Sequence, residues 1–157
     1  MRMFSSDKWR KSGFAKLREG KRVQAIVLDG RFWQDVSICL RASQPLVKVL
    51  RLVDSDEKPA MPFLYFEMIQ AKEKIKSNFN NVEKRYKPIL KIIDKRWEDQ
   101  MSRPFHYAAY WLNPQIHHSH GMGFNYNDPK VKVALYECVS RVAKDDEEKF
   151  RIMEQLH

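Results

Sequence analysis

Apolar residues recur along most of this sequence at intervals of three and four, which is the spacing of an amphipathic helix. Pro88 falls inside the cleanest such stretch, so a helix is predicted either to start there or to be kinked there. No stretch alternates polar and apolar residues with period two, and the pattern therefore predicts no strand. The apolar positions of the cleanest stretch are Val82, Tyr86, Ile89, Leu90, Ile93, Trp97 and Met101.

The N-terminal part of the chain contains two weaker helical patterns. Ser5 or Ser6 is expected to cap a basic helix over residues 5–19, and Gly20 to end it. The next pattern crosses the Asp29-Gly30 pair, and it predicts either one bent helix or two abutting helices. Its apolar members are Val23, Ile26, Val27, Trp33, Val36 and Leu40.

Prolines and capping residues predict where the remaining helices begin. Proline suits the first helical turn, and an acidic side chain just before that turn can cap it. The residue before a proline is pushed out of the helical region, so Asn113-Pro114 should end a helix. The expected starts are Pro45, Met61, Pro104, Pro129 after its cap Asp128, and the residue after Asp145, whose capping-box partner is Glu148.

Seven or eight helices with short connections predict an all-α fold, an irregular helical bundle. A chain of 157 residues with 43% hydrophobic content can close one core, so we expect a single helical domain over residues 1–157. One loop is expected at residues 54–59. Another is expected from the helix end at Asn113-Pro114 to Asn127. The other predicted core positions are Leu46, Val49, Leu50, Val53, Met61, Tyr65, Met68, Ile75, Phe79, Phe105, Ala108, Ala109, Leu112, Val131, Ala134, Leu135, Cys138, Val139 and Val142.

The charge of the chain favours a polyanionic partner. The formal net charge is +9 and the sequence pI is about 9.6. Residues 1–22 hold eight Lys/Arg against two Asp/Glu, and residues 72–96 hold nine against three, which gives +6 in each stretch. DNA is therefore a candidate partner, and a solvated lysine-rich surface is the alternative.

Neither a leader nor a membrane span is apparent in the sequence. No charged-then-apolar segment follows Met1, and no apolar run is long enough to cross a bilayer. We expect a soluble intracellular protein with no membrane partner, and no small-molecule substrate is indicated. Cys39 and Cys138 are predicted to be reduced core thiols, because no C-x-x-C pair is present.

Two groups of residues invite a metal-site hypothesis. A cluster of histidines lacks a nearby cysteine and the spacing of a structural zinc site, so a polar loop is favoured. Metal-dependent chemistry at a phosphate needs several converging carboxylates, and the available ones fit helix caps and ion pairs better. We therefore predict no cofactor. The histidines are His117, His118 and His120, and the carboxylates are Asp29, Asp54, Asp56, Asp94 and Asp99.

Two tryptophans could stack on unpaired bases while neighbouring cations track phosphates. Trp33 and Trp97, the latter next to Arg96, both fall on apolar helical faces. Core packing is therefore the favoured interpretation for both indoles.

Several short strings, in this order, resemble plant-type transposases of the hAT superfamily of transposable elements. The resemblance covers nearly the whole chain. The strings are Phe32-Trp33, the run from Pro45 through Leu46, Leu50 and Arg51 to Asp54, Lys58-Pro59-Ala60-Met61, Tyr86-Lys87-Pro88-Ile89, the run from Ile92 through Asp94 and Arg96 to Trp97, and the run from His106 to Asn113-Pro114.

The resemblance implies that this chain corresponds to the helical insertion of a ribonuclease-H-like catalytic domain. Such transposases carry two catalytic aspartates upstream of these strings and a catalytic glutamate downstream. None of those three contexts is visible here, so the chain looks truncated and is expected to lack catalysis of its own. A divalent metal would belong only to a complete enzyme of the family, and the family implies a nuclear location, with the cytoplasm as the alternative.

Three functions remain open from the sequence. The first is nonspecific DNA binding by an inactive transposase-like fragment. The second is a helical module that binds another protein or a transposase-like chain, or else a transposon remnant without function. The third is a part of a longer, active transposase. The candidate nucleic-acid contacts are Lys8, Arg10, Lys11, Lys16, Arg18, Lys21, Arg22, Arg51, Arg96 and Arg103.

Overall fold

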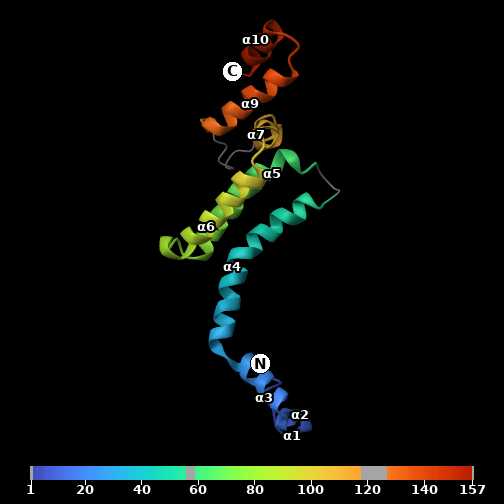
Figure 1. Cartoon of the computed structure of the whole chain (residues 1–157), viewed down its shortest axis with the longest axis vertical. Helices are drawn as coiled ribbons and strands as arrows, with labels where there is room; N and C mark the ends of the chain where they lie inside the picture. The colour runs from blue at the N-terminus through green and yellow to red at the C-terminus, as the bar shows by residue number, and fades with distance from the viewer. Residues whose placement is uncertain (1, 56–58, 118–126, 157) are drawn as a thin grey trace. The chain divides into compact units, whose positions relative to one another are not determined.

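The computed structural model describes residues 2–55, 59–117 and 127–156, and every regular element within them is helical. The all-α fold class is therefore confirmed. The described residues form ten α-helices and one π-helical turn, more than the seven or eight expected, because the N-terminal pattern divides into short helices (Figure 1). The chain folds into two compact units, residues 1–43 and 44–157. The single domain over residues 1–157 stays a prediction.

Two short helices and the first residues of a third replace the one helix predicted over residues 5–19. The Ser6 hydroxyl caps the first helix by accepting a hydrogen bond from the Trp9 amide at 3.2 Å. The Ser12 hydroxyl interrupts the pattern, because it caps a second helix through the Ala15 amide at 3.2 Å. The helices are α1 (Asp7–Lys11), α2 (Gly13–Lys16) and α3 (Arg18–Leu28).

Gly20 was expected to end a helix, and that prediction is wrong. Gly20 lies inside α3 and is buried. A Cβ atom placed there would come within 1.9 Å of the Phe14 carbonyl oxygen. The glycine therefore allows α3 to approach α2 closely. Gln24, one turn later, accepts a hydrogen bond from the Trp9 indole at 2.9 Å, which also ties α3 to α1.

The pattern around Asp29 resolves into two abutting helices. The second of them, α4 (Gly30–Val53), begins after Asp29, whose carboxylate accepts a hydrogen bond from the Arg31 amide at 2.8 Å. Pro45 was expected to start a new helix, but it lies inside α4. The Pro45 ring is buried, and the helix continues through it although proline lacks the amide for one backbone hydrogen bond.

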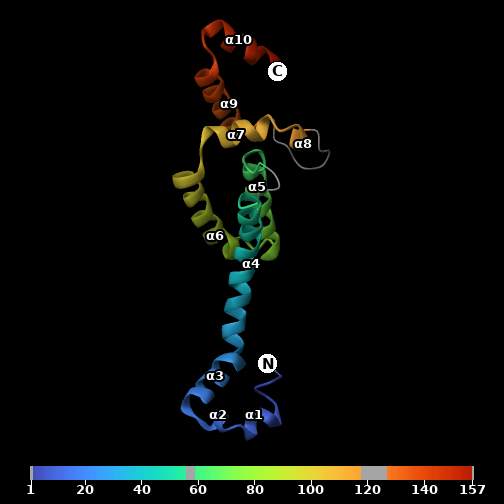
Figure 2. The same cartoon turned by 90° about the vertical axis from the view of Figure 1, so that its right-hand side faces the viewer.

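In the second unit, α5 (Met61–Asn78) and α6 (Glu83–Arg96) run in opposite directions and diverge from the turn that joins them (Figure 2). Asn80 and Asn81 reverse the chain between them, each with a φ of 56°. Asparagine tolerates this left-handed conformation better than most residues. Pro88 lies inside α6 and does not start it, so of the two predicted alternatives the helix start is wrong.

Four further helices complete the second unit. A π-helical turn, η1 (Trp97–Met101), ends α6, and the predicted starts at Pro104 and Pro129 are confirmed. The Asp145 carboxylate caps the last helix through the Glu148 amide at 2.7 Å, as predicted. The helices are α7 (Pro104–Trp111), α8 (Pro114–His117), α9 (Pro129–Val142) and α10 (Asp146–Gln155).

Two apolar clusters fill the second unit, one on each side of α5. The first lies where α7 crosses the N-terminal end of α5 and packs on α9 (Figure 2). The second joins α4, α5 and the start of η1. Their buried members are Phe66, Tyr107, Tyr110, Ile116, Val131 and Ala134 in the first cluster, and Val49, Leu64, Ala71 and Trp97 in the second.

Many predicted core positions are exposed in the structure. The helical stripes are wider than the surfaces on which the described helices pack, so residues at stripe edges and beyond the packed surfaces face solvent. Val142, at the end of α9, is the extreme case with 79% exposure. The corrected positions are Val23, Ile26, Trp33, Leu40, Leu50, Val53, Met61, Val82, Met101, Phe105, Leu112 and Val142.

Candidate nucleic-acid interface

All ten predicted nucleic-acid contacts are exposed. Seven lie in the first unit, and Arg51, Arg96 and Arg103 lie in the second. Arg10 forms an ion pair with Asp7 on the surface of α1, which reduces its availability to a phosphate. Residues 1–43 hold ten Lys/Arg against four Asp/Glu, a net charge of +6. The first unit therefore carries two thirds of the net charge of +9 on about a quarter of the chain.

The tightest group of predicted contacts lies on α3. Arg18, Lys21 and Arg22 are spaced i, i+3 and i+4, so they occupy a sector of about 100° on the helix. Gly20 and Gln24 lie outside this sector, on the part of α3 that contacts α2 and α1. The packing of the first unit thus leaves the three cationic side chains in solvent.

The three predicted arginines of the second unit lie in different surroundings. Arg51 and Lys48 line a hollow between α4 and α5, together with Lys74 of α5. Arg96 borders an apolar groove between α4, α5 and α6. Arg103 precedes α7 and is exposed.

A row of lysines on α6 was not among the predicted nucleic-acid contacts. Lys84, Lys87, Lys91 and Lys95 are exposed and recur at i, i+3, i+7 and i+11, which places them on one side of the helix. The half-buried residues of α6, among them Ile93, lie on the other side. The charge of residues 72–96 indicated this helix, and the spacing would have identified the row.

Lys87 forms a surface ion pair with Glu83 at 2.6 Å. The nearby carboxylate raises the pKa of Lys87, and the ammonium group lowers the pKa of Glu83. Lys87 is therefore the least available member of the row for a phosphate.

The strings that carry the family resemblance meet mainly in the core of the second unit. Trp97 is buried, as predicted, and its indole donates a hydrogen bond to the Tyr107 hydroxyl at 3.2 Å. Leu46 packs against the same cluster, and the side chain of Tyr86 is half-buried. Asp94 pairs with Lys72 of α5 at 2.5 Å and not with the neighbouring Lys91 or Lys95.

The string around Asn113 caps a helix. Asn113 is buried, and its side-chain oxygen Oδ1 accepts a hydrogen bond from the Gln115 backbone amide at 3.0 Å, at the start of α8. His106 contacts the Met101 carbonyl oxygen through Nδ1 at 2.8 Å. Pro59 and Met61 lie at the start of α5, and Pro114 begins α8, whereas Lys58 lies outside the described residues.

The first string departs from this arrangement. Phe32 and Trp33 form an edge-to-face pair with their ring centroids 5.3 Å apart, and both side chains are about 40% exposed. The Trp33 indole donates a hydrogen bond to the Val27 carbonyl at 2.7 Å. The core position predicted for Trp33 is therefore wrong, since no helix in the described part of the first unit covers it.

The candidate metal ligands do not gather within the part of the chain that the structure describes. No three His, Cys, Asp or Glu side chains there are placed to hold a metal ion. His118, His120 and Asp56 lie outside the described residues. Cys39 is exposed, so its predicted core position is wrong, and Cys138 is partly buried; both are free thiols.

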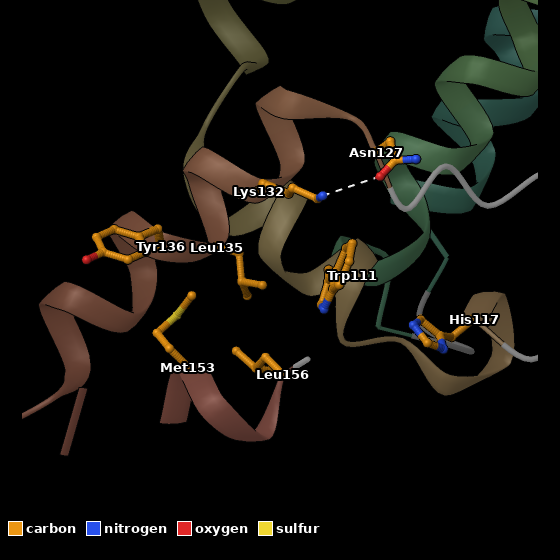
Figure 3. Close-up of a pocket in the computed structure, with 8 residues that line it drawn as sticks. All are labelled: Trp111, His117, Asn127, Lys132, Leu135, Tyr136, Met153 and Leu156. Carbon is orange, nitrogen blue, oxygen red and sulfur yellow. Dashed lines mark hydrogen bonds between the residues drawn. The ribbon is translucent and has the colours of Figure 1, made fainter. Parts of the chain in front are cut away.

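A cavity of about 370 Å³ lies between α7, α9 and α10 (Figure 3). Leu135, Met153 and Leu156 line its apolar side, and Lys132 reaches across to the Asn127 side-chain oxygen at 3.4 Å. None of the described residues that line it carries a carboxylate, and we assign the cavity no catalytic role.

No protein-family model matches the sequence, and comparisons with curated proteins and with solved structures gave no significant match. None of the helices in the described part of the chain is long and apolar enough to cross a membrane.

Proposed function

We propose that this chain is a catalytically inactive fragment of a hAT-type transposase that binds DNA nonspecifically through the first unit. The observation that carries this proposal is the exposed cluster of Arg18, Lys21 and Arg22 on α3. Lysine and arginine side chains that neutralise phosphates release counterions, and this supplies most nonspecific affinity. A nuclear location and the correspondence to a helical insertion belong to the same proposal.

The test is a titration of a labelled DNA duplex with residues 1–157 at several salt concentrations, with fluorescence anisotropy as the measure of binding. Replacing Arg18, Lys21 and Arg22 with Gln should make the slope of log K against log salt less negative by about 2.7, because each neutralised phosphate contributes roughly −0.9 to that slope. Lys130→Gln, Lys132→Gln and Lys144→Gln together provide a control that removes the same charge from exposed positions of the second unit.

Equal slopes for the α3 variant and the control would contradict the proposal, since net charge alone would then explain binding. An acidic polypeptide competitor gives a second check. Competition as effective as that of unlabelled duplex would show that any polyanion suffices.

A helical protein-interaction module is the second candidate function. Its support is an apolar groove of about 450 Å³, in which Arg96 is the one charged residue among the described residues that line it. Ile92 and Leu50 on its walls are 65% and 57% exposed. Association through this groove should persist at high salt, and Ile92→Asp should weaken it. Loss of association on raising the salt would count against this candidate.

A further inference from the structure

A hollow of about 440 Å³ in the second unit collects three cationic side chains from two helices. Lys48 and Arg51 come from α4, and Lys74 comes from α5. Two side-chain amides, Gln44 and Asn78, line the same hollow. Pro45 and Val47 complete the lining, and none of the described residues that line the hollow is acidic, so its charged groups are all cationic.

Helical spacing explains why these side chains share one side of each helix. Gln44, Lys48 and Arg51 follow one another at i, i+4 and i+7 along α4. Lys74 and Asn78 are spaced i and i+4 along α5. Leu46 and Val49 lie on a different side of α4, where they join the second core cluster. Core packing therefore holds the two polar rows in place beside each other.

The ion pairs near the hollow leave it with an excess of positive charge. Lys48 lies 3.6 Å from the carboxylate of Glu67, which balances one of the three cations. Neither Arg51 nor Lys74 forms an ion pair with any residue in the described ranges. The local excess is thus two positive charges at the hollow.

We propose that this hollow binds a phosphate group. A guanidinium offers paired N–H donors in the geometry of two phosphate oxygens, and an ammonium group adds a point charge. Arg51 is the bidentate donor, Lys74 and Lys48 supply charge, and the amide of Gln44 or Asn78 donates to a remaining oxygen. The site is separate from the α3 cluster and goes beyond DNA binding by the first unit.

Two sources share this phosphate chemistry, namely free phosphate and the backbone of a nucleic acid. The first arm titrates residues 1–157 with inorganic phosphate at constant ionic strength, with the ¹³C and ¹⁵N resonances of the arginine and lysine side chains as the readout. The shifts are expected at Arg51 and Lys74. The second arm uses a duplex oligonucleotide free of terminal phosphates, with the same readout.

Arg51→Gln should weaken phosphate binding about tenfold, which is the effect expected for one charge-assisted hydrogen-bonding partner. Arg51→Lys keeps the charge but not the paired donors, and should recover only part of the affinity. Arg141→Gln is the matched control, because Arg141 of α9 is an exposed arginine of the same unit that lies outside the hollow and is not among the predicted nucleic-acid contacts. Arg51 is also exposed, so the variant should remain folded, and far-ultraviolet circular dichroism checks this.

Shifts confined to the hollow, with weaker binding in Arg51→Gln and not in Arg141→Gln, support the site. If inorganic phosphate and the duplex both shift the resonances of the hollow, the site accepts either source of phosphate. If only one of them does, the site is specific for that source. Equal weakening in the two arginine variants, or no saturable shift with either probe, overturns it. DNA binding by the first unit is read separately, from the α3 variant, so the two proposals can fail independently.

Discussion

The two units differ in how many apolar side chains they bury. The fifteen buried hydrophobic side chains found in the described ranges, and the buried ring of Pro45, all belong to the second unit, whereas Gly20 is the one buried residue that the structure describes between positions 2 and 43. The first unit has helices, caps and a tryptophan–glutamine hydrogen bond, but little buried area. Because burial of apolar surface provides most of the stability of a fold, the first unit should be held much more weakly.

The largest expected effect compares the same substitution in each unit. Ile75 is fully buried, so Ile75→Ala should lower the free energy of unfolding by about 2–5 kcal/mol, through reduced burial and the cavity left behind. Ile26 in α3 is 45% exposed, and Ile26→Ala should cost well under half as much. Denaturant titration measures both. Similar changes in the two variants would show that Ile26 is packed against another surface in solution.

A second prediction sharpens the comparison inside the first unit. Gly20→Ala should disrupt the packing of α3 on α2, at a cost of about 1–3 kcal/mol to local stability, because the new Cβ would meet the Phe14 carbonyl. Gly13→Ala is the control, since no described atom lies within 4 Å of its Cβ position. Alanine favours a helix over glycine, so this control should stabilise α2 slightly. Amide hydrogen exchange in α3 distinguishes the two outcomes.

A third prediction concerns the pH dependence of the second unit. Burial, and then the hydrogen bond that Tyr65 donates to Asp128 at 2.7 Å, raise the pKa of the Tyr65 hydroxyl above its ordinary value. In the unfolded chain this hydroxyl ionises near its usual pKa of 10.0, while in the folded chain it keeps its proton. The stabilisation is therefore complete below pH 10 and is lost as the pH rises further.

Tyr65→Phe should make the fall in unfolding free energy above pH 10 shallower. The change should be less than about 1.4 kcal/mol per pH unit, because Tyr65 is only half-buried. Tyr136→Phe serves as the control, since Tyr136 is 50% exposed. If the two variants show the same pH profile, the Tyr65–Asp128 hydrogen bond contributes nothing to it.

The smallest effect is expected from the surface ion pair between Glu98 and Lys130. The ammonium group lowers the pKa of Glu98, but both side chains are largely exposed. Glu98→Gln should therefore change the free energy of unfolding by less than about 0.5 kcal/mol, and even less at high salt. A larger change would mean that the ion pair between η1 and α9 is more important to the second unit than its exposure suggests.

Local chemistry predicted the helix boundaries that depend on neighbouring residues. The Asp128 and Asp145 caps, and the proline starts at Pro104 and Pro129, were all correct because each needs only the next turn. Pro45 and Gly20 were misassigned because their surroundings come from segments elsewhere, through burial of a ring and close approach of α2. No sequence rule would have indicated the π-helical turn at Trp97 either.

The candidate sites divide in the same way. The charge pattern identified the exposed cations, since lysine and arginine side chains rarely leave the surface. The hollow required the pairing of α4 with α5, which places Lys74 beside Arg51 although 23 positions separate them in the sequence. The apolar stripes show which side of each helix is buried, but they do not show which helix packs against it. The proximity of Lys74 and Arg51 could therefore not be predicted from the sequence.

Pro45 also affects how motion travels along α4. Proline has no amide hydrogen, so α4 lacks one backbone hydrogen bond at Pro45. This position lies two residues beyond the boundary between the units at Ser43. Fraying that begins on the weakly held N-terminal side reaches a position where one bond is already missing and where the buried ring is anchored in the second unit. We therefore expect the part of α4 that precedes Pro45 to open transiently without unfolding the core beyond it.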